Sequence, residues 1–267
     1  MSTPARIRTV LVTGGAKRLG RACCLAFAQA GWKVLCHHQT SAREADETCR
    51  EIEQGGGKAL ALCADLSKAH EREALICAAI QSADQGLDAV VNNASVFEPD
   101  SGMAFSCELL QQQLQVNLIA PLHLGSLLAQ HAQSQAKEQA PALIHILDQK
   151  VFNLNPDYFS YTVSKLALER SVALQAQALA PHVRVSAIAP GLIFVSGPQS
   201  ADNFERAQSL NLMRSPTAAR DVARSAVFLA ENDSITGATL CVDKGQHLVP
   251  LERDVMFVVD QLTRPTT

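Results

Sequence analysis

Tyr161 and Lys165 stand four positions apart, a spacing that places both side chains on one face of an α-helix. An ammonium near a phenol stabilises the phenolate and lowers the phenol pKa from about 10. Tyr161 could therefore give or take a proton in a reaction. A surface pair on an ordinary helix has the same spacing. Of the two tyrosines in the chain, Tyr161 has a lysine four residues later and Tyr158 does not.

A glycine-rich turn near the start of the chain could bind phosphate. Residues 13–20 read Thr-Gly-Gly-Ala-Lys-Arg-Leu-Gly and lie between an apolar run and a helical pattern. Such a turn lets the backbone approach a pyrophosphate, and the following helix N-terminus supplies N–H groups and a positive dipole. A plain strand–helix turn would use glycine as well. The position favours a dinucleotide site that contains Gly14, Lys17, Arg18, Leu19 and Gly20.

The residues after the second apolar run favour NADPH over NADH. An acidic residue there would bind the ribose hydroxyls of NADH, but residues 37–41 read His-His-Gln-Thr-Ser and no carboxylate precedes Glu44. Hydroxyls and imidazoles suit a 2′-phosphate, although Thr40 or Ser41 could instead cap the next helix. The residues expected near this phosphate are His37, His38, Thr40 and Ser41, with positive charge from Lys17 and Arg18.

Polar residues also follow the third and fourth apolar runs. Asp65 and Leu66 follow the third, where the Asp65 carboxylate could accept a hydrogen bond from an adenine amino group. Asn93, Ala94 and Ser95 follow the fourth, at the strand end where ligands bind in parallel sheets. Two adjacent asparagines at this point could equally be turn residues.

Short apolar runs alternate with longer helical patterns along the chain. Continuous apolar runs fit parallel strands covered on both faces, and their alternation with helices predicts an α/β doubly wound fold, a seven-stranded, mostly parallel sheet with helices on both faces. The predicted strands are Thr9–Val12, Val34–His37, Ala59–Cys63, Ala89–Asn92, Leu143–Leu147, Val183–Ile188 and Thr239–Val242. The predicted helices cover about 18–30, 41–54, 68–84, 106–134, 160–180 and 217–231.

Composition excludes several classes of protein. The 267 residues are 47% hydrophobic and 18% charged, so the chain is not disordered. A net charge of −3 argues against a nucleic-acid partner. No run approaches the roughly 18 apolar residues of a membrane span, and Met1–Val10 lacks a secretory signal. Nothing marks a domain boundary, so we expect one domain over 1–267, with residues 194–216 forming a loop with at most a short helix.

The eight cysteines form no Cys-x-x-Cys pair, and most have apolar neighbours. We expect reduced, buried thiols in a cytoplasmic protein, without a zinc site or another metal.

Several of these motifs together resemble the short-chain dehydrogenase/reductase family. They are Thr13–Gly20, Asn92–Ala94, Asn117, Tyr161 with Lys165, and Pro190 with Gly191, in the order of the family and over almost the whole chain. The resemblance implies a Rossmann sheet, a nicotinamide cofactor that Pro190 and Gly191 help to line, and a homotetramer. It also implies that Asn117 helps to hold a water-linked proton path to Lys165. The segment Val249–Val259 would then pack at a subunit interface, or else form a final core segment.

Two departures from the general family pattern are informative. Arg18 replaces the middle glycine of the turn, and Asp148 replaces the usual serine thirteen residues before Tyr161. An ionised carboxylate only accepts hydrogen bonds, whereas a protonated one can donate. Polarisation of a simple ketone is therefore in doubt, while a buried Asp148 could pass a proton to a ring nitrogen. Both departures, and the sequence Asn-Ala-Ser-Val-Phe at 93–97, are similar to the pteridine reductase branch, which includes dihydromonapterin reductases.

This resemblance implies NADPH-dependent reduction of a dihydropterin, of the dihydrobiopterin, dihydromonapterin or dihydrofolate type. Tyr161 would supply the proton, Lys165 would tune Tyr161 and hold the nicotinamide ribose, and Asp148 would orient Tyr161. Phe97 would stack on the pterin, unless it is a core or lid residue. The implied catalytic residues are Asp148, Tyr161, Lys165 and Asn117, and the implied substrate contacts are Arg18, Ser95, Phe97, Asp148, Tyr161 and a loop at about 192–216.

Two other functions stay open on the sequence. One is a reductase of the same family that acts on a ketone, quinone or acyl thioester, which Asp148 and Phe97 disfavour. The other is a non-catalytic sensor that binds NADPH, which has no need of Tyr161 and Lys165.

Overall fold

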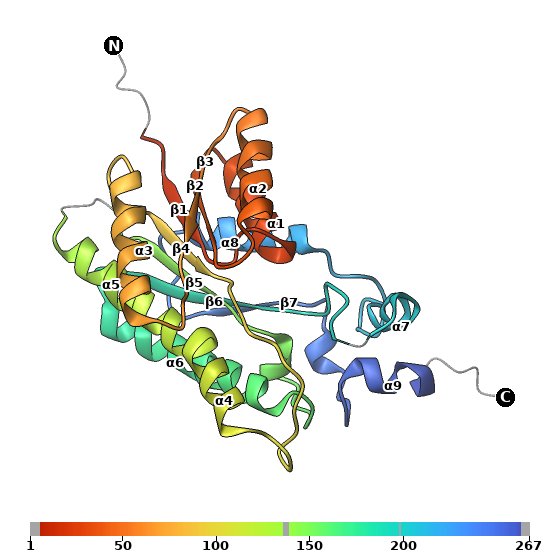
Figure 1. Cartoon of the computed structure of the whole chain (residues 1–267). Coiled ribbons are helices and arrows are strands. Elements are labelled where there is room, and N and C mark those ends of the chain that lie inside the picture. Colours follow the sequence, from red (N-terminus) through yellow and green to blue (C-terminus); the bar gives the residue numbers. More distant parts are fainter. Residues whose placement is uncertain (1–5, 136–138, 198, 263–267) are drawn as a thin grey trace.

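The seven strands form one sheet in the order β3-β2-β1-β4-β5-β6-β7, and every pair is parallel (Figure 1). The computed structural model describes residues 6–135, 139–197 and 199–262. Residues 1–5 and 263–267, the two ends of the expected domain, lie outside these ranges. Residue 198, which belongs to the expected 192–216 loop, does so as well. The strands are β1 (Thr9–Val12), β2 (Lys33–His38), β3 (Lys58–Cys63), β4 (Ala89–Asn92), β5 (Ala142–Ile146), β6 (Arg184–Pro190) and β7 (Thr239–Val242).

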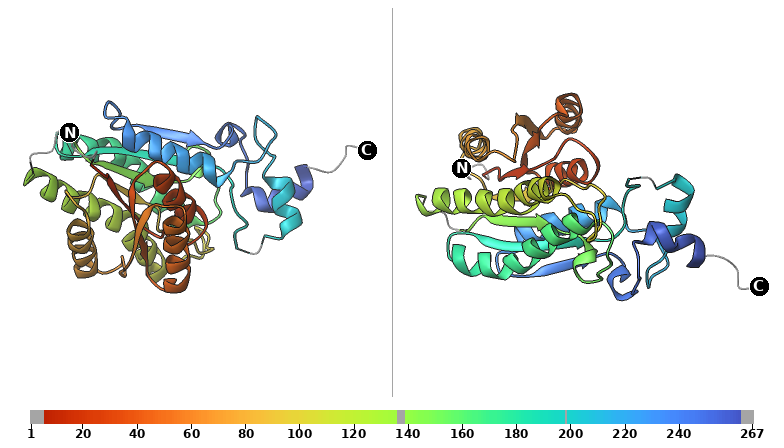
Figure 2. Two further views of the ribbon diagram at one scale, coloured as in Figure 1. Left: turned by 90° about the horizontal axis from the view of Figure 1, so that it is seen from above. Right: turned by 60° about the horizontal axis from the view of Figure 1, so that its bottom comes forward.

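Helices cover both faces of the sheet, as the continuous apolar strands predict (Figure 2). On β1, Val10 and Val12 pack with helices α1, α2 and α8, whereas Leu11 between them packs with α3, α5 and α6. The bounds are α1 (Arg18–Gln29), α2 (Ala42–Gln54), α3 (Ala69–Ser82), α4 (Cys107–Leu114), α5 (Ala120–Gln133), α6 (Phe159–Leu179), α7 (Ala201–Ala207), α8 (Ala219–Glu231) and α9 (Val255–Leu262).

The two edge strands of the sheet are less buried than the five inner strands. Strands β3 and β7 are only partly buried, because each has a neighbouring strand on one side alone. The prediction of buried cysteines is wrong for four of the eight: Cys63 and Cys241 lie on these edge strands, and Cys77 and Cys107 are exposed on helices. All eight are free thiols.

The single helix expected over 106–134 is interrupted. Helices α4 and α5 are joined by one π-helical turn, Gln115–Ile119, which holds Asn117. The N–H of Ala120 bonds to the carbonyl of Gln115, five residues back. Pro121 follows and has no N–H, so it cannot bond to the carbonyl of Asn117 as a regular helix would require.

The C-terminal half of the chain contains two helices that the sequence patterns did not define. Helix α7 lies within the loop expected at 194–216, and α9 follows the last strand. The two helices pack together through Ala207, Val255 and Val259 (Figure 1). This pair brings the end of the chain to the carboxyl edge of the sheet, where the polar residues at the strand ends gather.

A buried histidine links β4, β5 and α6 beneath that edge. The ring of His145 is fully buried, with Nδ1 3.2 Å from Asn92 Nδ2 and Nε2 2.9 Å from Gln175 Oε1. Burial lowers the pKa of His145 to about 4, against the opposing effect of the hydrogen bond with Gln175. The ring is therefore neutral in the folded protein near neutral pH.

We expect His145 to make the protein less stable in mild acid. Between about pH 6.5 and 4 the unfolded chain takes up a proton that the buried ring does not, so the free energy of unfolding falls as the pH falls. By pH 5, this ring should have lowered the free energy of unfolding by about 2 kcal/mol relative to neutral pH. Urea unfolding at pH 7 and pH 5 should show a smaller difference for His145→Gln than for the native protein. His70→Gln, at a residue whose side chain is 78% exposed, should leave it unchanged. An equal pH dependence in all three proteins would contradict this account.

Candidate active site

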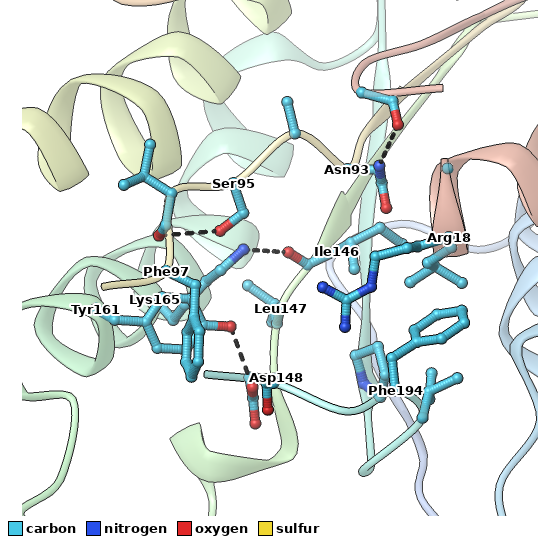
Figure 3. A pocket seen from close by; sticks show the side chains of 18 of the residues that line it. Arg18, Asn93, Ser95, Phe97, Ile146, Leu147, Asp148, Tyr161, Lys165 and Phe194 are labelled. Atoms are coloured by element: carbon cyan, nitrogen blue, oxygen red, sulfur yellow. Dashed lines mark hydrogen bonds between the residues drawn. The ribbon is translucent and has the colours of Figure 1, made fainter. Parts of the chain in front are cut away.

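A cavity of about 560 Å³ opens at the carboxyl ends of the strands. It runs from residues after β2, past the glycine turn and the ends of β4 and β5, to the turn after β5 and the C-terminal segment. In Figure 3, Arg18 and Phe194 lie on one side, Tyr161, Phe97 and Lys165 on the other, and Asp148 between them. Nearly all the residues predicted for the cofactor line it, namely Gly14, Lys17, Arg18, Leu19, Gly20, His37, His38, Thr40, Ser41, Leu66, Asn93, Ala94, Ser95, Tyr161, Lys165, Pro190 and Gly191.

The glycine turn is held against the end of β4. Asn93 Nδ2 donates to the carbonyls of Thr13 and Gly14, at 2.9 and 3.2 Å. In return, Thr13 Oγ1 accepts from the backbone N–H groups of Asn93 and Ala94, at 2.9 and 3.0 Å. A Cβ atom on Gly20 would lie 2.0 Å from the Gly14 carbonyl oxygen, so only glycine allows this close approach.

Arg18 occupies a backbone conformation that glycine normally takes. Its φ of 51° lies in the left-handed region, which explains why a glycine at this point would be the unstrained choice. Its guanidinium donates to the carbonyl of Val195 at 2.8 Å and lies 4.9 Å from the centre of the Phe194 ring. Arg18 therefore connects the glycine turn to the loop after β6.

His37 is hydrogen-bonded to the backbone of the glycine turn and is not positioned as a phosphate ligand. Its Nδ1 accepts from the N–H of Gly14 at 3.0 Å, and its Nε2 is 3.1 Å from the carbonyl of Ala64. Burial lowers the pKa of His37 to about 4, so the ring carries no charge near neutral pH. Both ring nitrogens are occupied, which contradicts the prediction that this imidazole suits a 2′-phosphate.

The other residues predicted near the 2′-phosphate line the cavity. Ser41 stands at the N-cap of α2, but its side chain makes no capping hydrogen bond. Buried His38 lines the cavity, and its Nδ1 has no hydrogen-bond partner within the described chain. Lys17 forms an ion pair with Glu44 across 2.6 Å, which holds its ammonium beside the start of α2.

Tyr161, Asp148 and Lys165 meet at the ends of β5 and α6. The Tyr161 hydroxyl donates to Asp148 Oδ2 at 3.1 Å (Figure 3), and Asp148 Oδ1 accepts from the N–H of Lys150 at 2.9 Å. Lys165 Nζ donates to the carbonyl of Ile146 at 2.7 Å and lies 5.7 Å from the centre of the Tyr161 ring. The i, i+4 spacing therefore does place both side chains on one face of a helix.

The prediction that Lys165 lowers the pKa of Tyr161 is wrong. Burial raises the pKa of Tyr161 well above 10, and the neighbouring Asp148 carboxylate raises it further. Burial also raises the pKa of Asp148, and it lowers the pKa of Lys165 to about 8. Tyr161 therefore keeps its proton at neutral pH, and the low-dielectric surroundings favour the protonated form of Asp148 as well.

Asn117 lies behind the cavity wall rather than on it. Its side chain is fully buried and bonds to the backbone of Val96, at 2.8 and 2.9 Å, and to Ser164 Oγ at 3.0 Å. Ser95 Oγ donates to Asn117 Oδ1 at 3.1 Å. Asn117 thus fixes the segment after β4 against α6, the helix that carries Tyr161 and Lys165.

Phe97 and Tyr158 form an aromatic wall beside Tyr161. The rings of Phe97 and Tyr158 are stacked, with centres 4.2 Å apart, and Phe97 meets the Tyr161 ring edge to face at 4.6 Å. Tyr158 is 2% exposed, and its φ of 54° is strained for a tyrosine. Its hydroxyl lies 3.6 Å from Met256 Sδ, whereas the hydroxyl of Tyr161 is the one that bonds to Asp148.

Asp65 is the predicted cofactor residue that does not line the cavity. Its carboxylate accepts from the N–H and hydroxyl of Ser67, at 3.0 and 2.7 Å, and pairs with Lys68 before helix α3. Thr13, Lys150 and Asp254 are among the residues that line or hold the site and were missed, whereas Phe194 lies in the loop predicted at about 192–216. The threonine lies within the glycine motif, whereas nothing in the sequence alone places the C-terminal Asp254 beside β5.

Within the described ranges, no group of three His, Cys, Asp or Glu side chains is arranged to hold a metal ion. Nor does any helix described there combine the length and apolar character needed to cross a membrane.

Comparisons with known proteins agree with this geometry. Residues 14–247 match the family model described as enoyl-(acyl carrier protein) reductase. The 3beta-hydroxysteroid dehydrogenase 1 of Eggerthella lenta is 33% identical over 91% of this chain and 95% of its own length. The dihydromonapterin reductase of Citrobacter koseri is 27% identical over 90% and 96%. The crystal structure of FolM alternative dihydrofolate reductase 1 from Brucella canis complexed with NADP aligns with a TM-score of 0.85 at 35% identity, over 92% and 96%.

The close packing at Gly20 predicts a loss of cofactor binding in Gly20→Ala. The added methyl would lie 2.0 Å from the Gly14 carbonyl oxygen and 2.6 Å from Asn93 Nδ2, so the turn must open. We expect the Kd for NADPH to rise at least tenfold and the free energy of unfolding to fall by about 1–3 kcal/mol. Fluorescence titration and urea unfolding measure the two effects. Gly55→Ala is the matched control, because its methyl would meet nothing closer than 3.4 Å. Native affinity in Gly20→Ala would refute the proposed role of this turn.

Proposed function

This chain belongs to the short-chain dehydrogenase/reductase family, and from that premise we propose that it reduces a dihydropterin to the tetrahydro form with NADPH. The observation that carries the proposal is the hydrogen bond between Tyr161 and Asp148, a carboxyl group buried where the general family pattern has a serine. The dihydromonapterin reductase and the FolM alternative dihydrofolate reductase among the similar proteins support the same substrate class.

The cavity fits a nicotinamide dinucleotide. The close approach of Gly14 and Gly20 leaves the backbone and the start of α1 open to a pyrophosphate. The uncapped Ser41, with Thr40 and Lys17, suits a 2′-phosphate, which is the distinguishing group of NADPH. Relatives crystallised with NADP support this choice. Lys165 would hold the nicotinamide ribose, and bound NADPH would supply the hydride.

The protein's own residues would supply the proton. Reduction of a carbon–nitrogen double bond adds a hydride to carbon and a proton to nitrogen. Tyr161 retains its proton at neutral pH because burial raises its pKa, so it can donate to that nitrogen directly or through water. Asp148 accepts the Tyr161 hydrogen bond and so orients the hydroxyl, and a protonated Asp148 can return a proton to Tyr161.

The aromatic wall suits a flat heterocyclic substrate. One face of Phe97 packs on Tyr158, which fixes the ring in place and leaves its remaining surface for stacking. A substrate there would lie within reach of Tyr161, since the Phe97 ring centre is 4.6 Å from the ring centre of Tyr161. Arg18 and the loop after β6 would close the opposite side.

We further propose a homotetramer in the cytoplasm, as the family resemblance implies. The apolar side chains of Phe152, Leu248 and Phe257 are exposed, and the Phe152 ring lies 6.2 Å from the ring of His247, so these side chains would contribute to a subunit interface.

NADPH oxidation with a substrate panel tests the proposed reaction. We expect turnover with 7,8-dihydromonapterin, 7,8-dihydrobiopterin or dihydrofolate. We expect little with ketones, quinones or acyl thioesters, because Asp148 replaces the serine hydroxyl that can donate a hydrogen bond to a carbonyl oxygen at any pH. Turnover of the ketone panel alone would favour the rival reductase, which the hydroxysteroid dehydrogenase relative makes a relevant alternative. NADPH binding without turnover of any substrate would favour a sensor.

Removing one hydroxyl tests the assignment of the proton donor. Tyr161→Phe should lower kcat by a factor of about 10² or more while leaving the Kd for NADPH within about twofold, because only the proton donor is lost. Tyr158→Phe is the matched control, since its hydroxyl contacts Met256 and not Asp148. Stopped-flow absorbance and fluorescence titration provide the two measurements. Substantial turnover in Tyr161→Phe would exclude it as the donor.

A further inference from the structure

A second pair of charged residues lines the cavity beyond Tyr161. Lys150 follows Asp148 in the turn after β5, and Asp254 immediately precedes α9. Lys150 Nζ lies 3.6 Å from Asp254 Oδ2 and donates to the carbonyl of Asp157 at 2.6 Å. Segments about a hundred residues apart in the sequence thus meet at this end of the cavity.

The position of Asp254 is fixed by a second ion pair outside the cavity. The Arg253 guanidinium donates to both carboxylate oxygens of Asp157, through Nε at 2.9 Å to each oxygen. Asp157 also accepts from the N–H of Asp254 at 2.7 Å, and Asp254 Oδ1 accepts from the N–H of Met256 at 3.2 Å. These bonds leave Asp254 Oδ2 directed at Lys150, with the Asp254 side chain 20% exposed.

The two members of the pair differ in what they can offer a ligand. Lys150 is 3% exposed, and its ammonium already has Asp254 and the Asp157 carbonyl as partners. The other cations on the cavity wall are Lys17 and Arg18 of the glycine turn and Lys165 of α6; Arg18 stands across the cavity from Phe97, where it donates to the carbonyl of Val195 (Figure 3). Among the described residues, this end of the cavity therefore presents acidic groups and neutral amides, but no cation free for an anionic ligand. The residues concerned are Asp148, Gln149, Asn153, Asn155, Gln246 and Asp254.

This charge pattern distinguishes between the two kinds of dihydropterin that the comparisons suggest, and the inference rests on the proposed function. With the cofactor along the glycine turn and the ring beside Phe97, the remaining space takes the substituent of the pterin. Dihydrofolate carries a p-aminobenzoylglutamate with two carboxylates, which need cationic partners. Dihydromonapterin carries a short chain of hydroxyls, which can donate hydrogen bonds to a carboxylate.

We propose that Asp254 is a specificity-determining residue that selects dihydropterins with an uncharged, hydroxylated side chain over those that end in glutamate. Its carboxylate accepts hydrogen bonds from the substrate hydroxyls and repels the glutamate carboxylates. Lys150 holds Asp254 in place and is itself neutralised. Arg253 and Asp157 position the segment that carries Asp254.

The test compares kcat/KM for 7,8-dihydromonapterin and dihydrofolate at saturating NADPH. The ratio of the two values cancels effects on folding, cofactor binding and chemistry, because both substrates share the reacting ring. The native enzyme should favour dihydromonapterin, and Asp254→Asn should shift the ratio toward dihydrofolate about tenfold, since the carboxylate is removed and the Lys150 ammonium loses the charge that neutralises it. The matched control is Glu252→Gln, at an exposed acidic residue two positions away that does not line the cavity; it should leave the ratio unchanged.

A measurement on the native enzyme covers the case in which Asp254→Asn does not fold. Raising NaCl from about 20 mM to about 0.5 M screens the repulsion, so kcat/KM for dihydrofolate should rise relative to that for dihydromonapterin. The role of Asp254 is overturned if the native kcat/KM for dihydrofolate equals or exceeds that for dihydromonapterin. It is also overturned if neither Asp254→Asn nor salt changes the ratio of the two values. Either result leaves the proposed function standing. Failure of both pterins as substrates instead overturns the proposed function.

Discussion

The hydrogen bonds between Thr13 and Asn93 fix the point on which the rest of the site depends. They join the end of β1 to the end of β4, the place in the sheet where the strand order reverses. The loops after β1 and β4 turn away from each other at such a point, and a crevice opens between them. Gly20 and Gly14 are in contact across the turn, and under the proposed function the crevice would hold a phosphate against this backbone at one end and the reacting ring at the other.

Burial of Asp148 changes what the tyrosine beside it can do. A serine hydroxyl can donate a hydrogen bond at any pH, whereas a carboxyl group donates only while it is protonated. The surroundings of Asp148 disfavour its charge, and Asp148 in turn makes ionisation of Tyr161 harder. Both groups therefore favour their protonated forms, and under the proposed function they would supply a proton and would not stabilise an oxyanion. Such a site is suited to an acceptor that is itself basic, as a ring nitrogen is and a ketone oxygen is not.

Much of this architecture could be predicted from the sequence because it depends on local patterns. Continuous apolar runs located the seven strands to within two residues, and the motif order placed Tyr161, Lys165 and Asn93 at one edge. Predictions failed where distant packing decides the outcome. The roles of His37 and Asp65 depend on neighbours that only the folded chain provides, and so does the raised pKa of Tyr161. The position of Asp254 depends on an ion pair between Arg253 and Asp157, which no periodicity in the sequence predicts.

The contact between the C-terminal segment and the turn after β5 also has a consequence for how this wall of the cavity can move. Three contacts converge on Asp157: its carboxylate accepts from the Arg253 guanidinium and from the N–H of Asp254, and its carbonyl accepts from Lys150 Nζ. A shift of the backbone at Asp157 would therefore displace Asp254 and Lys150 in the same direction. The two members of the ion pair are coupled through a residue that belongs to neither of their segments.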